Sequence, residues 1–239
     1  MNRSLASVLL GLTVLPTLTG LVVLALLKMG DQPSLAQYSV VLVLSYLVGS
    51  VPWGYIMLAW GRGVDIREYG SGRTGMSNVL RTAGGKLAAL VLALDVGKGI
   101  LAVMLARVII GATEAEVAAG LLVLIGHNWP VFLKFRGGRG IATGGGVLSI
   151  IAPISAGVAA IAFLSATLLS RYLSLGSITG VITAALTLLV LDLLGLSSTP
   201  YTLYGVFAGA IIIWQHRDNI QRIRQGNERR LGNPARRLE

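Results

Sequence analysis

The 239-residue chain contains no cysteine and only two histidines. The lack of cysteine excludes a disulfide, a thiolate nucleophile and cysteine ligands for a metal. No H-E-x-x-H sequence and no dense group of histidines and carboxylates occurs, so we predict neither a metal site nor a cofactor. Neither histidine begins the H-x-x-x-x-D pattern of acyltransferases with thioester donors, and no G-x-S-x-G nucleophile elbow is present.

Charged residues are also scarce, at 13% of the chain, while hydrophobic residues make up 54%. Soluble domains rarely have this composition, and several stretches of about 20 apolar residues predict transmembrane helices. The fold class that we predict is therefore an all-α integral membrane protein. The apolar stretches lie at residues 5–27, 37–60, 86–109, 115–133, 143–170, 175–195 and 200–215.

Acidic residues number only 10 against 20 lysines and arginines, which gives a formal net charge of +10. The basic residues gather in the connectors 61–85 and 134–142 and in the tail after Gln215, whereas 110–116 and 196–199 have none. Because lysine and arginine mark the cytoplasmic side of a membrane, we predict that the three basic segments face the cytoplasm. The positive charge then favours anionic membrane lipids or a phosphorylated substrate as partners, rather than nucleic acid.

The stretch 143–170 has a basic residue near each end, Arg139 and Arg171, and Pro153 lies in its middle. Proline removes a backbone donor and favours a kink or break in a helix. We therefore expect two tilted half-length helices that return to the cytoplasmic side. The alternative is a single crossing with Arg171 outside.

The stretch 5–27 has two interpretations, because Ser34-Leu35-Ala36 weakly resembles a cleavage site. Its apolar run is long for a signal peptide, so we expect a retained helix and eight membrane segments, or seven if the first is removed. The expected organisation is an extra transmembrane segment at 1–36, a membrane domain at 37–220 and a basic cytoplasmic tail at 221–239.

A glycine-rich motif, GSGRTG, occupies residues 70–75. It fits G-x-G-x-x-G, but a membrane helix precedes it instead of a strand, so we reject a dinucleotide-binding unit. Glycines let backbone N–H groups converge on an oxyanion, and arginine matches the geometry of a phosphate. This motif and Arg81 together indicate a phosphate site. The alternative is a solvated turn with arginines that orient the protein in the membrane.

Three further motifs lie at predicted cytoplasmic ends, at residues 126–140, 171–177 and 216–219. Each combines basic and small hydrogen-bonding residues, although the last taken alone fits the end of a helix. Asp95 and Lys98 lie three residues apart within a span, which fits a structural ion pair better than an ion relay.

Taken together, the motifs resemble those of the bacterial membrane family of acyl-phosphate:glycerol-3-phosphate acyltransferases. The family patterns G-S-G-N-x-G-x-T-N-x-x-R and G-H-x-x-P-V…K-G-G-K-G-x-A-T correspond to GSGRTGMSNVLR and GHNWPVFLKFRGGRGIAT in this chain. The patterns R-Y-x-S-L-x-S, H-R-x-N-I and L-D-x-x-K-G correspond to RYLSLGS, HRDNI and LDVGKG. The resemblance covers residues 37–230 in order.

The resemblance implies transfer of a fatty acyl group from acyl phosphate to the 1-hydroxyl of glycerol 3-phosphate, which gives lysophosphatidic acid and phosphate in the first acylation of phospholipid synthesis. It also implies about seven family transmembrane helices in the bacterial cytoplasmic membrane, with the active site facing the cytoplasm. The implied catalytic residues are Ser71, Arg81, Arg139, Ser177, His216 and Asn219. The implied acyl phosphate-binding residues are Gly70, Ser71, Gly72, Arg73, Gly75, Ser77 and Asn78.

The chain departs from the family pattern at three positions. Arg139 replaces lysine and Ser77 replaces threonine, which preserves a charge and a hydroxyl. Arg73 replaces asparagine and adds a charge to the donor loop. The N-terminal 36 residues lie outside the family pattern.

Two mechanisms fit this acyl transfer, and two other functions are alternatives to it. We favour a substrate-assisted reaction in which the donor's own phosphate accepts the hydroxyl proton, and His216 as general base is the alternative. A transporter or channel for a phosphorylated anionic metabolite would place polar groups deep in several spans, but most spans here are aliphatic. A lipid-binding scaffold would not explain four ordered motifs.

Overall fold

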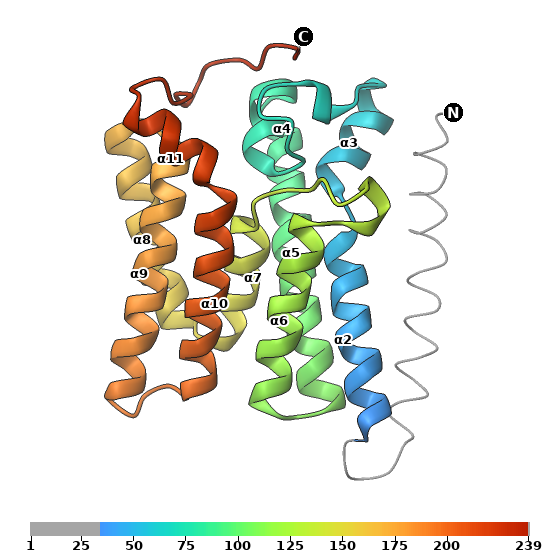
Figure 1. The fold of residues 1–239 in the computed structure, drawn as a ribbon, viewed down its shortest axis with the longest axis vertical. Coiled ribbons are helices and arrows are strands. Elements are labelled where there is room, and N and C mark those ends of the chain that lie inside the picture. Colours follow the sequence, from blue (N-terminus) through green and yellow to red (C-terminus); the bar gives the residue numbers. More distant parts are fainter. Residues whose placement is uncertain (1–33, 239) are drawn as a thin grey trace.

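The structure is a computed structural model that describes residues 34–238. The first expected span, at 5–27, lies outside the described residues, so its retention stays a prediction. Within 34–238 the regular structure is helical and no β-strand is formed, which confirms the predicted fold class (Figure 1).

The helices follow one another through short connectors. They are α2 (Leu35–Ser50), α3 (Trp53–Arg62), η1 (Ile66–Glu68), α4 (Met76–Ala83), α5 (Gly85–Ile109), α6 (Thr113–Asn128), η2 (Val131–Leu133), α7 (Ile141–Ile151), α8 (Pro153–Ser170), α9 (Leu173–Leu193), α10 (Thr199–Gln215) and α11 (Arg217–Arg224).

Several of these helices are suited to a membrane. In the described chain, five stretches are long and apolar enough to cross one: Leu35–Arg62, Gly85–Ile109, Thr113–Leu133, Pro153–Ser170 and Leu173–Leu193. α10 has 17 residues and α7 has 11, and both are also apolar. Large apolar side chains are exposed on the outer surface of the bundle, as lipid contact requires. The protein is thus a multi-pass membrane protein, and the number of its crossings stays a prediction.

The expected span at 37–60 lies within the stretch Leu35–Arg62, which is long and apolar enough to cross a membrane, but its helix is interrupted at Pro52. α2 ends at Ser50 and α3 begins at Trp53. Lys98 Nζ donates a hydrogen bond of 3.1 Å to the Val51 carbonyl oxygen at this break. The same ammonium lies 2.9 Å from Asp95 Oδ1, and both side chains are buried. Lys98 is therefore a second donor, beside Trp53 N at 3.2 Å, to a carbonyl that the proline break leaves outside the helix ladder.

The expected reversal within 143–170 is present. α7 ends at Ile151, Pro153 is the first residue of α8, and α8 runs back toward the end where α7 begins (Figure 1). Arg171, just after α8, meets the C-terminal tail, since its carbonyl accepts a hydrogen bond of 2.7 Å from Leu231 N. The expectation of two half-length helices is wrong for α8, which has 18 residues and is long enough to cross a membrane.

Glycines allow the central helices to approach backbone to backbone. A Cβ on Gly49 of α2 would overlap the Val123 carbonyl of α6, and a Cβ on Gly99 of α5 would overlap the Thr143 carbonyl of α7. Small residues at such crossings are typical of helix packing in membranes, where dispersion contacts replace the hydrophobic effect. The Gly99 crossing fixes α7, and with it the connector that precedes α7, against α5.

One end of the bundle collects the three basic segments. The connector between α3 and α5, the connector between α6 and α7 and the tail after α10 all lie at this end, and the loops after α5 and α9 lie at the other (Figure 1). This grouping agrees with the charge pattern of the sequence. The side of the membrane that it faces stays a prediction.

A matched pair of glycines in α5 tests the packing. We expect Gly99→Ala to lower the melting temperature in detergent, because its Cβ would force α7 away at a cost of about 1–3 kcal/mol. Gly97 has open space where a Cβ would stand, so Gly97→Ala should leave the melting temperature unchanged or raise it slightly. Equal melting temperatures for the two variants would contradict this packing.

Candidate active site

A cavity of about 490 Å³ opens among the basic segments and continues between the helices. Arginines from two connectors line it: Arg73 and Arg81 lie between α3 and α5, in the glycine-rich loop and in α4, and Arg139 lies in the turn before α7. Burial lowers the pKa of Arg73 and of Arg81. Burial and repulsion from nearby Arg73 lower the pKa of Arg139 to about 9. The three remain cationic at neutral pH, so the cavity concentrates positive charge that is poorly hydrated.

The sequence-predicted residues divide into two groups. Eight line the cavity and four are absent from its lining. The lining residues are Arg73, Gly75, Ser77, Arg81, Arg139, Ser177, His216 and Asn219. The other four, Gly70, Ser71, Gly72 and Asn78, belong to the same glycine-rich loop and the helix that follows it.

Asn78 holds the glycine-rich loop in shape from within. Its side chain is fully buried. The amide nitrogen donates hydrogen bonds to the carbonyls of Tyr69 and Arg73, each 2.9 Å long, and Oδ1 accepts one of 3.1 Å from Ser71 N. Gly70 has φ +57°, and a Cβ there would overlap the Asn78 side chain. The loop is therefore set before any ligand arrives, and the sequence did not indicate this internal role of Asn78.

His216 lies at the junction of α10 and α11, beside the arginines. Its Nδ1 lies 2.8 Å from the Ile212 carbonyl oxygen. Burial, followed by repulsion from Arg139, lowers the pKa of His216 to about 4. The imidazole is therefore neutral at pH 7, Nδ1 carries its proton toward Ile212, and Nε2 is left as an acceptor.

Sequence reasoning missed the contribution of the C-terminal tail, which it treated as basic and topogenic. Glu228 and Arg229 both line the cavity. The Glu228 carboxylate accepts hydrogen bonds from three side chains, and Arg229 Nη2 donates to the Gly70 carbonyl at 3.2 Å. The signal that could have found Glu228 is its charge, because it is the one acidic residue between Asp218 and Glu239.

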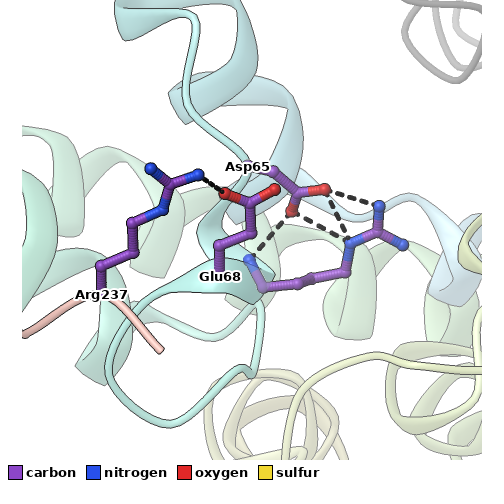
Figure 2. A network of polar contacts seen from close by, with 4 residues as sticks. Asp65, Glu68 and Arg237 are labelled. Atoms are coloured by element: carbon purple, nitrogen blue, oxygen red, sulfur yellow. Dashed lines mark hydrogen bonds and ion pairs between the residues drawn. The ribbon is translucent and has the colours of Figure 1, made fainter. Parts of the chain in front are cut away.

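The tail also crosses the outer side of the glycine-rich loop. Gly70 N donates to the Arg236 carbonyl at 2.8 Å, and Leu238 N donates to the Glu68 carbonyl at 2.7 Å. Arg237 Nη2 lies 2.9 Å from Glu68 Oε2, close to Asp65, whose carboxylate is paired with Arg67 (Figure 2). The tail therefore contacts both the glycine-rich loop and α11 and links these two walls of the cavity.

The part of the cavity between the helices is mainly apolar, although Asp95 of α5 and His127 of α6 also line the cavity. Its lining comes from α7, α8, α9 and α10, and small residues predominate. They include Gly145, Ala156, Ala159, Gly180, Ala184 and Ala208. A cationic mouth with an apolar interior suits a ligand that has an anionic head and a hydrocarbon chain.

Comparison with known proteins gives one consistent family. A family model described as glycerol-3-phosphate acyltransferase matches residues 39–226. Glycerol-3-phosphate acyltransferase 3 of Dehalococcoides mccartyi is 44% identical over an alignment of 214 residues, which covers 84% of this chain and 99% of that protein.

Two solved structures have a similar fold. The crystal structure of PlsY (YgiH), an integral membrane glycerol 3-phosphate acyltransferase, in its glycerol 3-phosphate form has a TM-score of 0.75 and 36% identity, over 82% of this chain and 96% of that one. Its lysophosphatidic acid form has a TM-score of 0.72 and 33% identity, over 82% of this chain and 95% of that one.

The ionisation of His216 is directly measurable, because the chain has only two histidines. We expect the ring resonances of His216 in the ligand-free protein to titrate near pH 4, since protonation would add a buried charge beside Arg139. A histidine NMR titration in micelles measures this, and the spectrum of His216→Gln assigns the signal. A midpoint at pH 6.5 or above would contradict the described environment.

Proposed function

This chain belongs to the glycerol-3-phosphate acyltransferase family, and from that membership we infer the donor, the site residues and the orientation that follow. The protein is an acyltransferase that converts glycerol 3-phosphate to lysophosphatidic acid. We propose that its donor is an acyl phosphate and that the cavity opens to the cytoplasm of a bacterium.

The observation that carries the proposal is the division of one cavity into a cationic mouth and an apolar interior. An acyl phosphate needs both, because its head is an anion and its tail is a hydrocarbon. The second substrate is also an anion, so two phosphoryl groups must lie close together. Arginines from the two connectors can supply charge-assisted hydrogen bonds for both groups.

We assign the acceptor to the side of the cavity formed by α9, α10 and α11. Ser177, His216 and Asn219 line it, and Arg139 and Arg81 face it from the two connectors. The Ser177 hydroxyl donates to the Leu173 carbonyl at 2.8 Å, so its oxygen is free to accept from a ligand hydroxyl. These groups suit the two hydroxyls and the phosphate of glycerol 3-phosphate.

We assign the donor phosphate to the side of the mouth opposite the acceptor site, where the loop 70–75 and the start of α4 lie. Gly75 precedes α4, and Arg73, Gly75 and Ser77 line the cavity there. The N–H groups of Gly70, Ser71 and Gly72 already donate within the protein. The donors that we assign to the phosphate are therefore the N-terminus of α4, the Ser77 hydroxyl and the Arg73 guanidinium. Arg73 stands where the family pattern has asparagine, so this loop has one more positive charge with which to bind the donor phosphate.

In the proposed reaction the 1-hydroxyl oxygen attacks the acyl carbonyl carbon. The new C–O ester bond forms, the bond between the carbonyl carbon and the phosphate oxygen breaks, and the hydroxyl proton passes to the departing phosphate. Positioning of the two substrates can supply about 7–11 kcal/mol of barrier reduction. Donors that stabilise the developing oxyanion can each supply about 3–4 kcal/mol.

The environment of His216 supports the substrate-assisted route over a histidine base. A general base works best with a pKa near the operating pH, whereas burial and Arg139 lower the pKa of His216 to about 4. A neutral imidazole can still accept a hydrogen bond from the attacking hydroxyl and orient it. The transporter alternative is not favoured, because the relatives are named as acyltransferases.

The choice of donor tests the proposal. We expect the purified protein, given radiolabelled glycerol 3-phosphate and palmitoyl phosphate, to release lysophosphatidic acid and inorganic phosphate in equal amounts. Palmitoyl-CoA at the same concentration should give no product, because a thioester brings no acyl-linked phosphate to the cationic mouth. Product from palmitoyl-CoA but not from palmitoyl phosphate would contradict the assigned donor.

A further inference from the structure

Glu228 is a buried carboxylate in an exposed, basic tail. Its side chain is 3% exposed, while Asn227 before it and Arg230 after it are exposed. It lies two residues beyond the matched family segment, which ends at residue 226. Burial of a carboxylate requires compensation by donors or cations, so its partners indicate what it does.

Three donors meet the Glu228 carboxylate. Asn219 Nδ2 donates to Oε1 at 2.7 Å, Ser174 Oγ donates to the same oxygen at 3.0 Å, and Arg222 Nε donates to Oε2 at 2.8 Å. The carboxylate therefore joins α9 and α11, the two helices that carry Ser177 and Asn219. It does so from the wall of the cavity, which it lines together with Asn219 and Ser174.

This contact determines which way the Asn219 amide faces. A carboxylate only accepts hydrogen bonds, so the amide atom at 2.7 Å must be the NH₂ group. The opposite orientation would bring two oxygens into repulsive contact. Asn219 Oδ1 is thereby turned away from Glu228, and among the described residues it has no hydrogen-bond partner although the residue is only 4% exposed.

We propose that Glu228 is a positioning residue that holds Asn219 Oδ1 as a hydrogen-bond acceptor for a hydroxyl group of glycerol 3-phosphate. The proposal rests on the acceptor site assigned above. A buried acceptor without a partner costs about 1–3 kcal/mol, which a ligand hydroxyl recovers on binding. In this way the tail contributes to recognition of the glycerol hydroxyls as well as to the shape of the mouth.

If Glu228 only neutralised the arginines, its removal would change the affinity for glycerol 3-phosphate in the opposite direction. Glu228 acts electrostatically on Arg81, Arg139 and Arg229. Removal of its charge would strengthen the positive field and tighten the binding of a phosphate anion. Loss of the acceptor geometry weakens binding instead, so the direction of the change separates the two roles.

A double-mutant cycle on the full-length protein in detergent tests the proposal. Calorimetry without any donor gives the Kd for glycerol 3-phosphate of the wild type, Glu228→Ala, Asn219→Ala and the double variant. We expect each single variant to bind about tenfold more weakly, and the double variant to bind no more weakly than Asn219→Ala. Tighter or unchanged binding by Glu228→Ala would overturn the proposal. The proposal would also fail if the two single-variant losses of affinity multiplied in the double variant.

Two further variants separate positioning from folding. Glu228→Gln keeps an oxygen that can accept from Asn219 and should bind more tightly than Glu228→Ala; equal losses would overturn the proposal. Glu68→Gln removes the ion pair with Arg237 and leaves Glu228 in place, so it should bind as the wild type does. If Glu68→Gln reproduces the loss, docking of the tail explains it and the positioning role fails.

The cycle also distinguishes this proposal from the proposed function. A wild-type protein that binds no glycerol 3-phosphate would overturn the assigned acceptor site, and this inference with it. A wild type that binds but shows independent losses overturns only the role of Glu228.

Discussion

Guanidinium groups held out of water at one end of the helix bundle are the constraint on which the rest of the structure depends. Arg139 is the most enclosed of them, and its Nε donates to the Gln215 carbonyl at 3.2 Å. Positive charges that repel one another in a desolvated site are costly. The close helix crossings and the tail hold them there, so an anion that enters the mouth relieves repulsion and gains charge-assisted hydrogen bonds.

The same arrangement explains why the site lies where a membrane meets water. The arginines come from connectors, which lie at the bundle's end, while the apolar part of the cavity descends between α7 and α10. A substrate with a hydrocarbon chain can extend into the interior while its head stays at the mouth. Pro153 separates α7 from α8, and both helices line the cavity. At the Pro52 break, Lys98 and Trp53 N both donate to the Val51 carbonyl.

Much of this could be predicted because the informative residues lie in ordered motifs. Apolar runs predicted the helical class, and Pro153 predicted the reversal between α7 and α8. The break at Pro52 was missed because the apolar pattern continues through it. Glu228 was missed because arginines surround it in the sequence and its role depends on contacts across 54 residues with Ser174. The internal role of Asn78 likewise depends on a folded loop.

The most direct test of the central constraint is the affinity for glycerol 3-phosphate when one buried guanidinium is changed. Calorimetry should compare the wild type with Arg139→Gln and with Arg139→Lys, the residue usual in the family pattern. We predict that Arg139→Gln binds roughly 10–100-fold more weakly, since a charge-assisted hydrogen bond is lost, and that Arg139→Lys stays within about tenfold of the wild type. Wild-type affinity in Arg139→Gln would show that the buried positive charge does not hold the substrate.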